Sequence, residues 1–411
     1  MGSPLAASLI RSRVVGSCRW QWNLSSKPGK AHASPARSAV LPPSIRPVPR
    51  RPHRPLSFSR INRERGLDRP VTAGYQASLT RTTAGATTIS GRTAPLAPMG
   101  SPRGSCVSRL VVDFDSTCTQ RDTTALYGEL AAEEAEARND LERGAAIRQA
   151  WKEAGLAYME QYDKAMALAL QEAPQRREAF DLPALRRFLA AMSVMEQASM
   201  DDLVRNKLLA GVSRPAIADA VRAGRVPLQE GCLRVLHRCA HDKIAVSVLS
   251  VNPSRELLSA ALHLDAWPAV TPPPEILSNE LEQQGEVSTG ALSGGIHTPL
   301  HKEACFERLA SAAAPPGASP PSARKPAESQ GLTVYVGDSV TDLLPLVSAD
   351  LGVLLGCSAS AERVCRAFGV TLQAVPEFLA QHQDRPVESR RGTGRLLQAQ
   401  SWSRRRQGRR P

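Results

Sequence analysis

Residues 110–117 read LVVDFDST, so a short apolar run leads directly into two closely spaced aspartates. Leu110–Val112 predicts a buried strand, because consecutive branched apolar residues are typical of sheet interiors. Alternate side chains of an extended segment point to the same side, which would place Asp113 beside Asp115. Of two such carboxylates, one can act as an unprotonated nucleophile and the other as a general acid. Both also offer the hard oxygen ligands that suit Mg²⁺.

Two polar residues occupy comparable positions later in the chain. Ser250 directly follows the predicted strand Ile244–Leu249, where a hydroxyl and free backbone N–H groups can hold phosphate oxygens. Lys302 lies in the first turn of a helix that is predicted after Pro299. A fixed ammonium at such a position would offset charge on a transferring phosphoryl group. Both residues are therefore candidates for binding phosphate.

A further acidic motif, GDSVTD at residues 337–342, follows the predicted strand Leu332–Val336. Gly337 would permit a tight turn at the end of that strand. Asp338 and Asp342 can then face the same metal ion, since carboxylate oxygens are the ligands that Mg²⁺ prefers.

Each of these four pieces has a common structural explanation when it is taken alone. A pair of aspartates is often solvated, a serine after a strand is usually a turn residue, and a lysine usually lies on a solvated face. The last motif could simply be an Asp-rich turn that opens a helix. Their order, with each piece beside a predicted strand or helix start, favours one joint functional site.

The elements around these motifs alternate between strands and helices. That order predicts an α/β fold with a mostly parallel sheet covered on both faces, and such sheets bind ligands at the carboxyl ends of their strands. A helical block from about 120 to 240 interrupts the alternation and is interpreted as a cap inserted after the first strand. Its predicted helices are Trp151–Gln171, Leu182–Met200 with Asp181 as the N-cap, a short helix that starts at Ser213, and Leu228–Cys239.

Later elements are predicted from shorter runs, and the periodic pattern dissolves after about Leu379. They are a hairpin over 276–293, a helix at Lys302–Ala312, a strand at Leu351–Leu355 and a helix at Ala361–Phe368.

Composition divides the chain into one folded region, 106–380, and three segments without periodicity. Residues 1–105 and the Arg-rich residues 381–411 are expected to be disordered, and the Pro- and Ala-rich residues 311–330 are expected to form a surface insertion. The formal net charge is +13, but 1–105 and 381–411 are both basic, so the folded region is acidic.

The first 30 residues contain five basic side chains and no acid, which is typical of a transit peptide. An organellar location is expected, with the mitochondrion favoured over the chloroplast. If this leader carries no targeting signal, the expected location is the cytoplasm.

Several classes of protein are not favoured by the composition. The eight cysteines form no CxxC pair and no zinc spacing, so they are interpreted as small apolar residues in a reducing compartment. No apolar run approaches the 18 residues that a membrane span needs. The basic termini lack interleaved aromatic residues, so a role in binding nucleic acid is not favoured.

In this order, DFDST, a strand ending in serine, a lysine and GDSxxD resemble the haloacid dehalogenase (HAD) superfamily of phosphatases over about residues 108–375. The resemblance implies a Rossmann-like sheet, a C1-type helical cap, Mg²⁺ and an aspartyl-phosphate intermediate. By position, it implies that Asp113 is the nucleophile and Asp115 the acid/base. It also implies that Ser250, Lys302 and Thr117 bind the phosphate, and that Mg²⁺ is bound by Asp113, the backbone carbonyl of Asp115, Asp338 and, in support, Asp342.

Longer strings resemble one branch of this superfamily, the phosphatase half of the plant bifunctional TenA/HAD thiamine-phosphate phosphatases. The strings are VDFDSTCTQRDTTA at 112–125, VSVLS at 246–250, EVSTG at 286–290, and GDSVTDLLPLVSADLGVLLG at 337–356. This resemblance implies hydrolysis of thiamine monophosphate to thiamine. The chain departs from that branch because 1–105 is too short and too polar to be a TenA-type domain.

Two alternatives remain open at the level of the sequence. The phosphate ester could be another small metabolite, such as phosphoserine, a nucleotide or pyridoxal phosphate. The scaffold could instead be a non-catalytic binding module, although the complete set of motif residues argues against this. The presence of Asp115 disfavours a dehalogenase, because a departing halide needs no proton.

Overall fold

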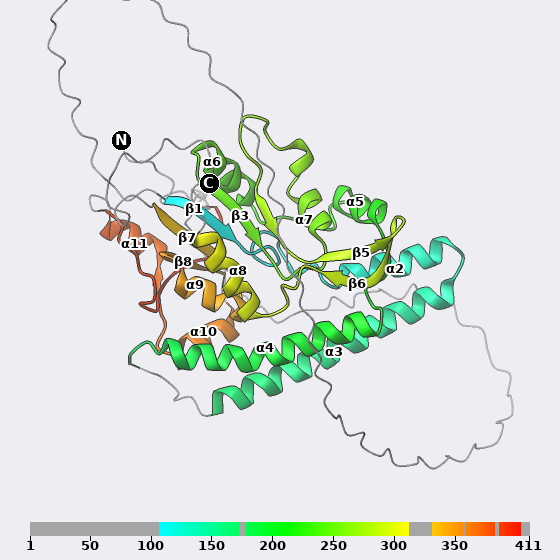
Figure 1. The fold of residues 1–411 in the computed structure, drawn as a ribbon, viewed down its shortest axis with the longest axis horizontal. Helices are drawn as coiled ribbons and strands as arrows, with labels where there is room; N and C mark the ends of the chain where they lie inside the picture. The colour runs from blue at the N-terminus through cyan, green and yellow to red at the C-terminus, as the bar shows by residue number, and fades with distance from the viewer. Residues whose placement is uncertain (1–106, 172–177, 312–330, 357, 383–385, 404–411) are drawn as a thin grey trace, which may run out of the picture. The chain divides into compact units, whose positions relative to one another are not determined.

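Short runs of branched apolar residues build the central sheet of the protein (Figure 1). The computed structural model describes residues 107–171, 178–311, 331–356, 358–382 and 386–403. Seven strands lie in the order β4-β3-β1-β7-β8-β10-β9, and all neighbouring pairs are parallel. Their bounds are β1 Val107–Val112, β3 Ala245–Leu249, β4 Glu275–Leu277, β7 Leu332–Gly337, β8 Leu351–Leu355, β9 Thr371–Ala374 and β10 Arg395–Ala399. The predicted α/β fold is therefore confirmed.

The register of the three central strands aligns their carboxyl ends. Val112, the last residue of β1, pairs with Val248 of β3 and with Val336 of β7. The residues that follow these strands consequently meet at one edge of the sheet. The backbone N–H of Asp113 extends the ladder by one bond, to the carbonyl oxygen of Val336 at 2.9 Å.

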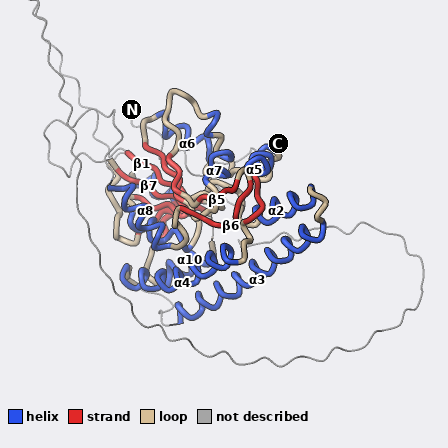
Figure 2. Tube along the Cα trace, turned by 45° about the vertical axis from the view of Figure 1, so that its right-hand side comes forward, coloured by secondary structure: helices blue, strands red, loops and turns tan. Residues whose placement is uncertain are grey.

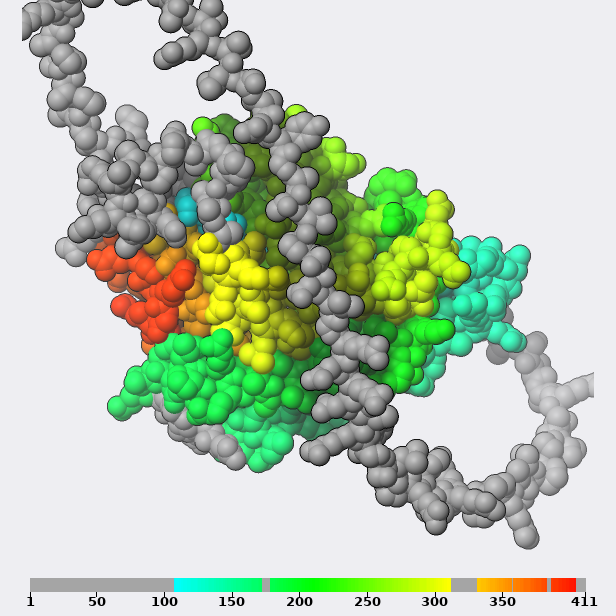
Figure 3. Space-filling view, in the orientation of Figure 1, coloured from blue at the N-terminus to red at the C-terminus, as the bar shows by residue number. Residues whose placement is uncertain are grey.

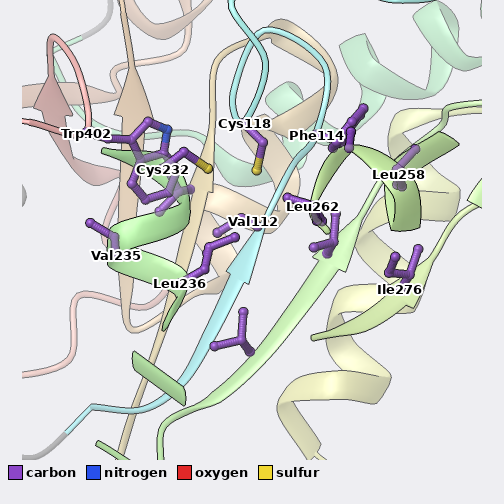
Figure 4. Close-up of a cluster of buried hydrophobic side chains, with 14 of the residues drawn as sticks. Val112, Phe114, Cys118, Cys232, Val235, Leu236, Leu258, Leu262, Ile276 and Trp402 are labelled. Atoms are coloured by element: carbon purple, nitrogen blue, oxygen red, sulfur yellow. The ribbon is translucent and has the colours of Figure 1, made fainter. Parts of the chain in front are cut away.

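Helices cover both faces of the sheet, as Figure 2 shows. Leu110 and Val112 belong to one buried cluster and Val111 to another, so successive residues of β1 point into different cores. In Figure 4, Val112 lies near Val235 and Leu236 of the helix on its face. The helices after the cap are α6 Cys232–His241, α7 Arg255–Ala261, α8 Pro299–Ser311, α9 Leu343–Ser348, α10 Ala359–Ala367 and α11 Val375–Gln381, with short 3₁₀ turns η1 Leu264–Ala266 and η2 Val340–Asp342.

The predicted helical cap contains two long helices that run side by side, α3 and α4 (Figure 1). Asp181 begins α4 as predicted, because its side chain accepts a hydrogen bond from the backbone N–H of Ala184 at 2.9 Å. Ser213 caps the next helix in the same way, with a bond from Ala216 N at 3.1 Å. The helices of this block are α2 Leu126–Ala137, α3 Leu141–Gln171, α4 Leu182–Arg205 and α5 Arg214–Arg222.

The block is not purely helical, which corrects the sequence interpretation. Strand β2, Ala210–Ser213, pairs with β6 Val287–Ser293 of a hairpin whose other strand is β5 Glu280–Gln284, and the three form a small antiparallel sheet. The hairpin predicted over 276–293 begins later, because residues 276–277 belong to β4 of the main sheet. Four residues reading AGVS carry no strand pattern of their own, and their partner lies more than 70 residues later in the sequence. The helix predicted from Leu228 begins later, at Cys232, and packs against β3 of the main sheet.

The prediction that residues 381–411 form a disordered tail is wrong for residues 386–403. Residues 395–399 form β10, which lies between β8 and β9 in the sheet. The apolar run Leu396-Leu397 is too short to stand out among the arginines, and the pairing comes from strands distant in sequence. Residues 1–105, 312–330 and 404–411 lie outside the described residues. Within the described part of the chain, no helix has the length and apolar character to cross a bilayer.

Candidate active site

The side chain of Lys302 connects two of the predicted aspartates at the carboxyl edge of the sheet. Its Nζ lies 2.6 Å from Asp113 Oδ1 and 2.7 Å from Asp342 Oδ1, and all three residues are buried. Burial alone would lower the pKa of the Lys302 ammonium, but the two carboxylates outweigh it and raise that pKa above its usual value. A buried lysine requires such partners, because an unpaired ammonium would lose its hydration without compensation.

Asp342 is the most completely bonded acid of the site. Besides Lys302, it accepts hydrogen bonds from Tyr335 Oη at 2.7 Å and from the backbone N–H and hydroxyl of Ser339 at 3.1 and 2.7 Å. Burial would raise the pKa of Asp342, but Lys302 and these hydrogen bonds lower it below its usual value. Asp342 is therefore an ionised partner that holds Lys302 in place.

Gly337 is required for a reason that the sequence did not indicate. We predicted a tight turn, but this residue is the last of β7 and does not have positive φ. A Cβ atom at this position would lie 2.5 Å from Cγ of Asp342. The missing side chain therefore lets Asp342 approach the strand end.

Asp338 completes a group of three carboxylates. One carboxylate oxygen from each of Asp113, Asp338 and Asp342 lies within 4.8 Å of the others. Burial, followed by the charges of Asp113 and Asp342, raises the pKa of Asp338 well above its usual range. If all three acids are ionised, they exceed the single ammonium of Lys302 in charge, and a hard divalent cation would offset that excess. The donor set therefore fits Mg²⁺.

The nearby Asp113 carboxyl is also affected by its surroundings. Burial raises its pKa to about 7, and Asp342 and Asp115 act in the same direction, whereas Lys302 lowers it. A cation bound at the three carboxylates would favour the ionised form that a nucleophile needs.

Asp115 is held by residues that the sequence interpretation did not include. Its Oδ1 accepts bonds from the backbone N–H and hydroxyl of Thr123 at 2.8 and 2.7 Å, and its Oδ2 accepts from Asn252 Nδ2 at 2.8 Å. Tyr127 Oη in turn donates to Asn252 Oδ1 at 2.6 Å. Burial raises the pKa of Asp115, although the bonds from Asn252 and Thr123 oppose the shift. A carboxyl that is oriented and easily protonated can donate or accept a proton.

Position after a strand was the one signal that could have identified Asn252, since it comes two residues after Ser250. Thr123 and Tyr127 carry no such signal, because only the folded chain brings them to Asp115.

The structure places the remaining predicted residues at the same edge of the sheet. Ser250 is fully buried at the end of β3, and its hydroxyl accepts a bond from Asn252 N at 3.1 Å. Its own backbone N–H is not free, contrary to the sequence interpretation, because it donates to Leu277 O at 2.9 Å. Thr117 is buried too, and its hydroxyl donates to Asp338 Oδ1 at 3.0 Å. All seven predicted residues therefore meet in one place.

Comparison with known proteins gives one curated relative and several solved structures. No family model matches the chain. The relative is the mitochondrial bifunctional TH2 protein of Arabidopsis thaliana, which is 26% identical over 311 residues. The match covers 71% of this chain and 47% of the TH2 protein, so the chain spans about half the length of that relative.

The solved structures include phosphatases and a nucleotidase. A phospho-aspartyl intermediate analogue of phosphoserine phosphatase has 16% identity and a TM-score of 0.34, over 62% of this chain and 90% of that one. Cytosolic 5′-nucleotidase IIIB bound to cytidine has 11% identity and a TM-score of 0.35, over 72% of this chain and 82% of that one. The match to this plant bifunctional protein confirms the resemblance to plant bifunctional proteins that the sequence strings indicate.

Proposed function

We propose that this protein is a Mg²⁺-dependent phosphomonoesterase that forms a transient aspartyl-phosphate, an acyl phosphate, at Asp113. The observation that carries the proposal is the position of Lys302 Nζ, 2.6 Å from Asp113 and 2.7 Å from Asp342. A buried ammonium beside a strand-end carboxylate offers a place where a phosphate group and its attacking acid can meet.

In the first step, a carboxylate oxygen of Asp113 attacks phosphorus, and the bond between phosphorus and the ester oxygen breaks. Lys302, with Ser250 and Thr117, would hold the negative phosphate oxygens during the transfer. The electron pair leaves on the ester oxygen, which takes a proton from Asp115. The raised pKa of Asp115 supports this role, because burial favours its protonated form.

In the second step, water attacks phosphorus of the aspartyl-phosphate. Asp115, now ionised, accepts a proton from that water, and the Asp113 carboxylate is released together with inorganic phosphate. The bonds from Thr123 and Asn252 would keep the Asp115 carboxyl in one orientation through both steps.

We propose that Asp113, Asp338, Asp342 and the backbone carbonyl of Asp115 provide the Mg²⁺ site. When bound, the ion would offset the negative charge that the carboxylates share with the phosphate. The proximity of the three carboxylates supports this assignment.

The substrate that we propose is thiamine monophosphate, with thiamine as the product. Support comes from the four sequence strings and from the match to the bifunctional TH2 protein. Because that protein is named as mitochondrial and residues 1–30 have the composition of a transit peptide, we also propose a mitochondrial location.

The chemistry is tested by phosphate release from p-nitrophenyl phosphate with and without Mg²⁺. We expect release by the full chain only with the metal, and a loss of at least about 10³-fold in Asp113→Asn, because the amide cannot attack phosphorus. Asp265→Asn replaces an exposed aspartate on η1 and should retain full activity. No Mg²⁺-dependent release by the wild-type chain would favour the non-catalytic binding module instead.

The substrate is tested separately by comparing kcat/KM across thiamine monophosphate, phosphoserine, pyridoxal phosphate and nucleoside monophosphates. Thiamine monophosphate should be preferred. If another ester has the highest kcat/KM, the substrate assignment fails while the phosphatase chemistry stands.

A further inference from the structure

The loop that follows β1 contains a backbone conformation that is unfavourable without support. Ser116 has a φ of 58°, in the left-handed region that a serine rarely occupies. Its N–H donates to Thr119 Oγ1 at 2.9 Å, and the N–H of Cys118 donates to Phe114 O at 2.8 Å. Such a conformation persists where the surrounding structure fixes it. The contacts that fix this loop therefore help to place the residues it carries.

Two of these contacts come from parts of the chain far from the loop. Trp402 Nε1 donates to the backbone carbonyl of Thr117 at 2.7 Å, and Gln229 Nε2 donates to that of Ser116 at 2.7 Å. Figure 4 shows the Trp402 ring beside Cys232, at the end of the β1 strand from which the loop with Cys118 leads away. The indole is fully buried, so water does not compete for this hydrogen bond.

The same loop residue contacts the candidate active site through its side chain. The Thr117 hydroxyl donates to Asp338 Oδ1 at 3.0 Å, and Asp338 belongs to the group of three carboxylates. A shift of the Thr117 peptide would therefore move a partner of Asp338 and the neighbouring loop that carries Asp115. Trp402 therefore contacts one residue of the site, Thr117, and is connected to the carboxylates through it.

The surrounding backbone leaves space for this tryptophan. Gly231, with a φ of 91°, directly precedes α6, and a Cβ there would lie 3.2 Å from Ser403 Cβ and 3.4 Å from the carbonyl carbon of Trp402. Residues 402–403 follow β10, so the sheet itself delivers them to this position. The backbone of residues 402–403 thus lies close to the start of α6, and burial leaves the indole little freedom to turn.

We propose that Trp402 is a positioning residue of the candidate active site, whose indole N–H fixes the Thr117 peptide and thereby the loop between Asp113 and Thr119. This inference rests on the proposed phosphatase activity for its kinetic consequence. The inference gives the segment after β10 a role in positioning the candidate active site. The arginine-rich composition of that segment did not indicate such a role.

The test is Trp402→Phe in the full chain, which removes the N–H donor and keeps an aromatic ring. The matched control is Trp267→Phe, because the buried Trp267 Nε1 has no hydrogen-bond partner among the described residues. With p-nitrophenyl phosphate and saturating Mg²⁺, we expect kcat of Trp402→Phe to fall about 10-fold with KM changed less than about two-fold, and Trp267→Phe to match the wild type.

A second measurement separates this inference from the proposed function. Hydrogen exchange of the amides of Cys118 and Thr119, both bonded to Phe114 O, should be faster in Trp402→Phe than in Trp267→Phe. Unchanged kcat and unchanged exchange in a folded Trp402→Phe would overturn the inference. If the wild type releases no phosphate but the exchange difference is seen, the proposed function fails and the positioning of the loop by Trp402 stands.

Discussion

At the scale of single residues, the site depends on buried side chains of opposite charge that stabilise one another. Lys302 is 1% exposed and bonded to Asp113 and Asp342, which are themselves buried. Removing one charged partner leaves the other buried and unpaired. This lowers the free energy of unfolding more than replacing all the charged partners by apolar residues would. The stability and the chemistry of the site therefore depend on the same contacts.

The substitution Lys302→Met should lower the free energy of unfolding by about 3–5 kcal/mol and abolish phosphate release, because two buried carboxylates lose their partner. Urea denaturation and the release assay measure the two effects. The control is Lys164→Met, which breaks an exposed ion pair with Glu160 on α3 and should change stability by less than about 1 kcal/mol. Equal urea midpoints for the two variants would contradict the stabilisation of the two buried carboxylates by Lys302.

A second prediction at the scale of residues concerns Glu196 on α4 and the dependence of stability on pH. Burial raises its pKa to about 7 from an ordinary value of 4.5, although the bond from Tyr158 Oη at 3.0 Å and the charge of Lys302 oppose the shift. Between those two values the native state binds more protons than the unfolded state. The contribution of Glu196 to the free energy of unfolding therefore falls as pH rises through this window.

The substitution Glu196→Gln removes this titration. We expect the variant to gain stability relative to the wild type on going from pH 5 to pH 8, as measured by urea denaturation at each pH. Glu160→Gln is the control, because the pKa of the exposed Glu160 is lowered and its titration does not reduce stability in this window. The same stability difference between Glu196→Gln and the wild type at both pH values would be incompatible with a raised pKa.

At the scale of elements, β10 shows how a short strand can be decisive. It inserts between β8 and β9, and its residue Leu397 pairs with Val353 and is 3% exposed. Without β10, neither of the flanking strands would have its neighbour on that side. The strand also leads into Trp402, so it links the far side of the sheet to the loop after β1.

The prediction at the scale of elements concerns Leu397, a buried side chain of β10. Leu397→Ala should destabilise the protein by about 2–5 kcal/mol, since it leaves a cavity in the buried cluster on one face of the sheet. Leu156→Ala, at a leucine of α3 that is 63% exposed, should change stability by less than about 0.5 kcal/mol. Similar urea midpoints for both variants would show that β10 contributes little to the sheet.

At the scale of the whole molecule, an ion pair joins α4 of the helical block to α8 of the main sheet region. Arg186 of α4 lies 2.7 Å from Glu303 of α8, and the Glu303 side chain is 5% exposed. Figure 3 shows the surface of α4, in green, against that of α8, in yellow. Glu303 is adjacent to Lys302, so α4 is attached at the helix that supplies the ammonium of the candidate active site.

Arg186→Met should therefore lower the free energy of unfolding by about 1–3 kcal/mol, because Glu303 loses its ionic partner in a buried position. Burial already raises the pKa of Glu303, against the charge of Arg186, so the loss should be larger at pH 8 than at pH 5. The neighbouring exposed Arg187→Met is the control, measured by the same urea titrations. An Arg186→Met variant indistinguishable from Arg187→Met at pH 8 would refute a role in attaching the cap.

The sequence by itself determined the class of fold, and it predicted the residues for which we propose the chemistry of the site. Asp113, Ser250 and Asp338 each follow a strand whose apolar run is local, and parallel strands bring their carboxyl ends together by rule. Lys302 was identified in the same way, from its place at the start of a helix. Short-range patterns suffice here because each motif is attached to the element that positions it.

Only the tertiary structure decided the contacts between residues distant in the chain. Thr123 and Asn252 hold Asp115, β2 pairs with a later hairpin, and Trp402 bonds to Thr117 across 285 residues. None of these has a local pattern, because each depends on which surfaces the packed elements bring into contact. The sequence predicted which groups react, and the packing of the whole chain determines how firmly they are held.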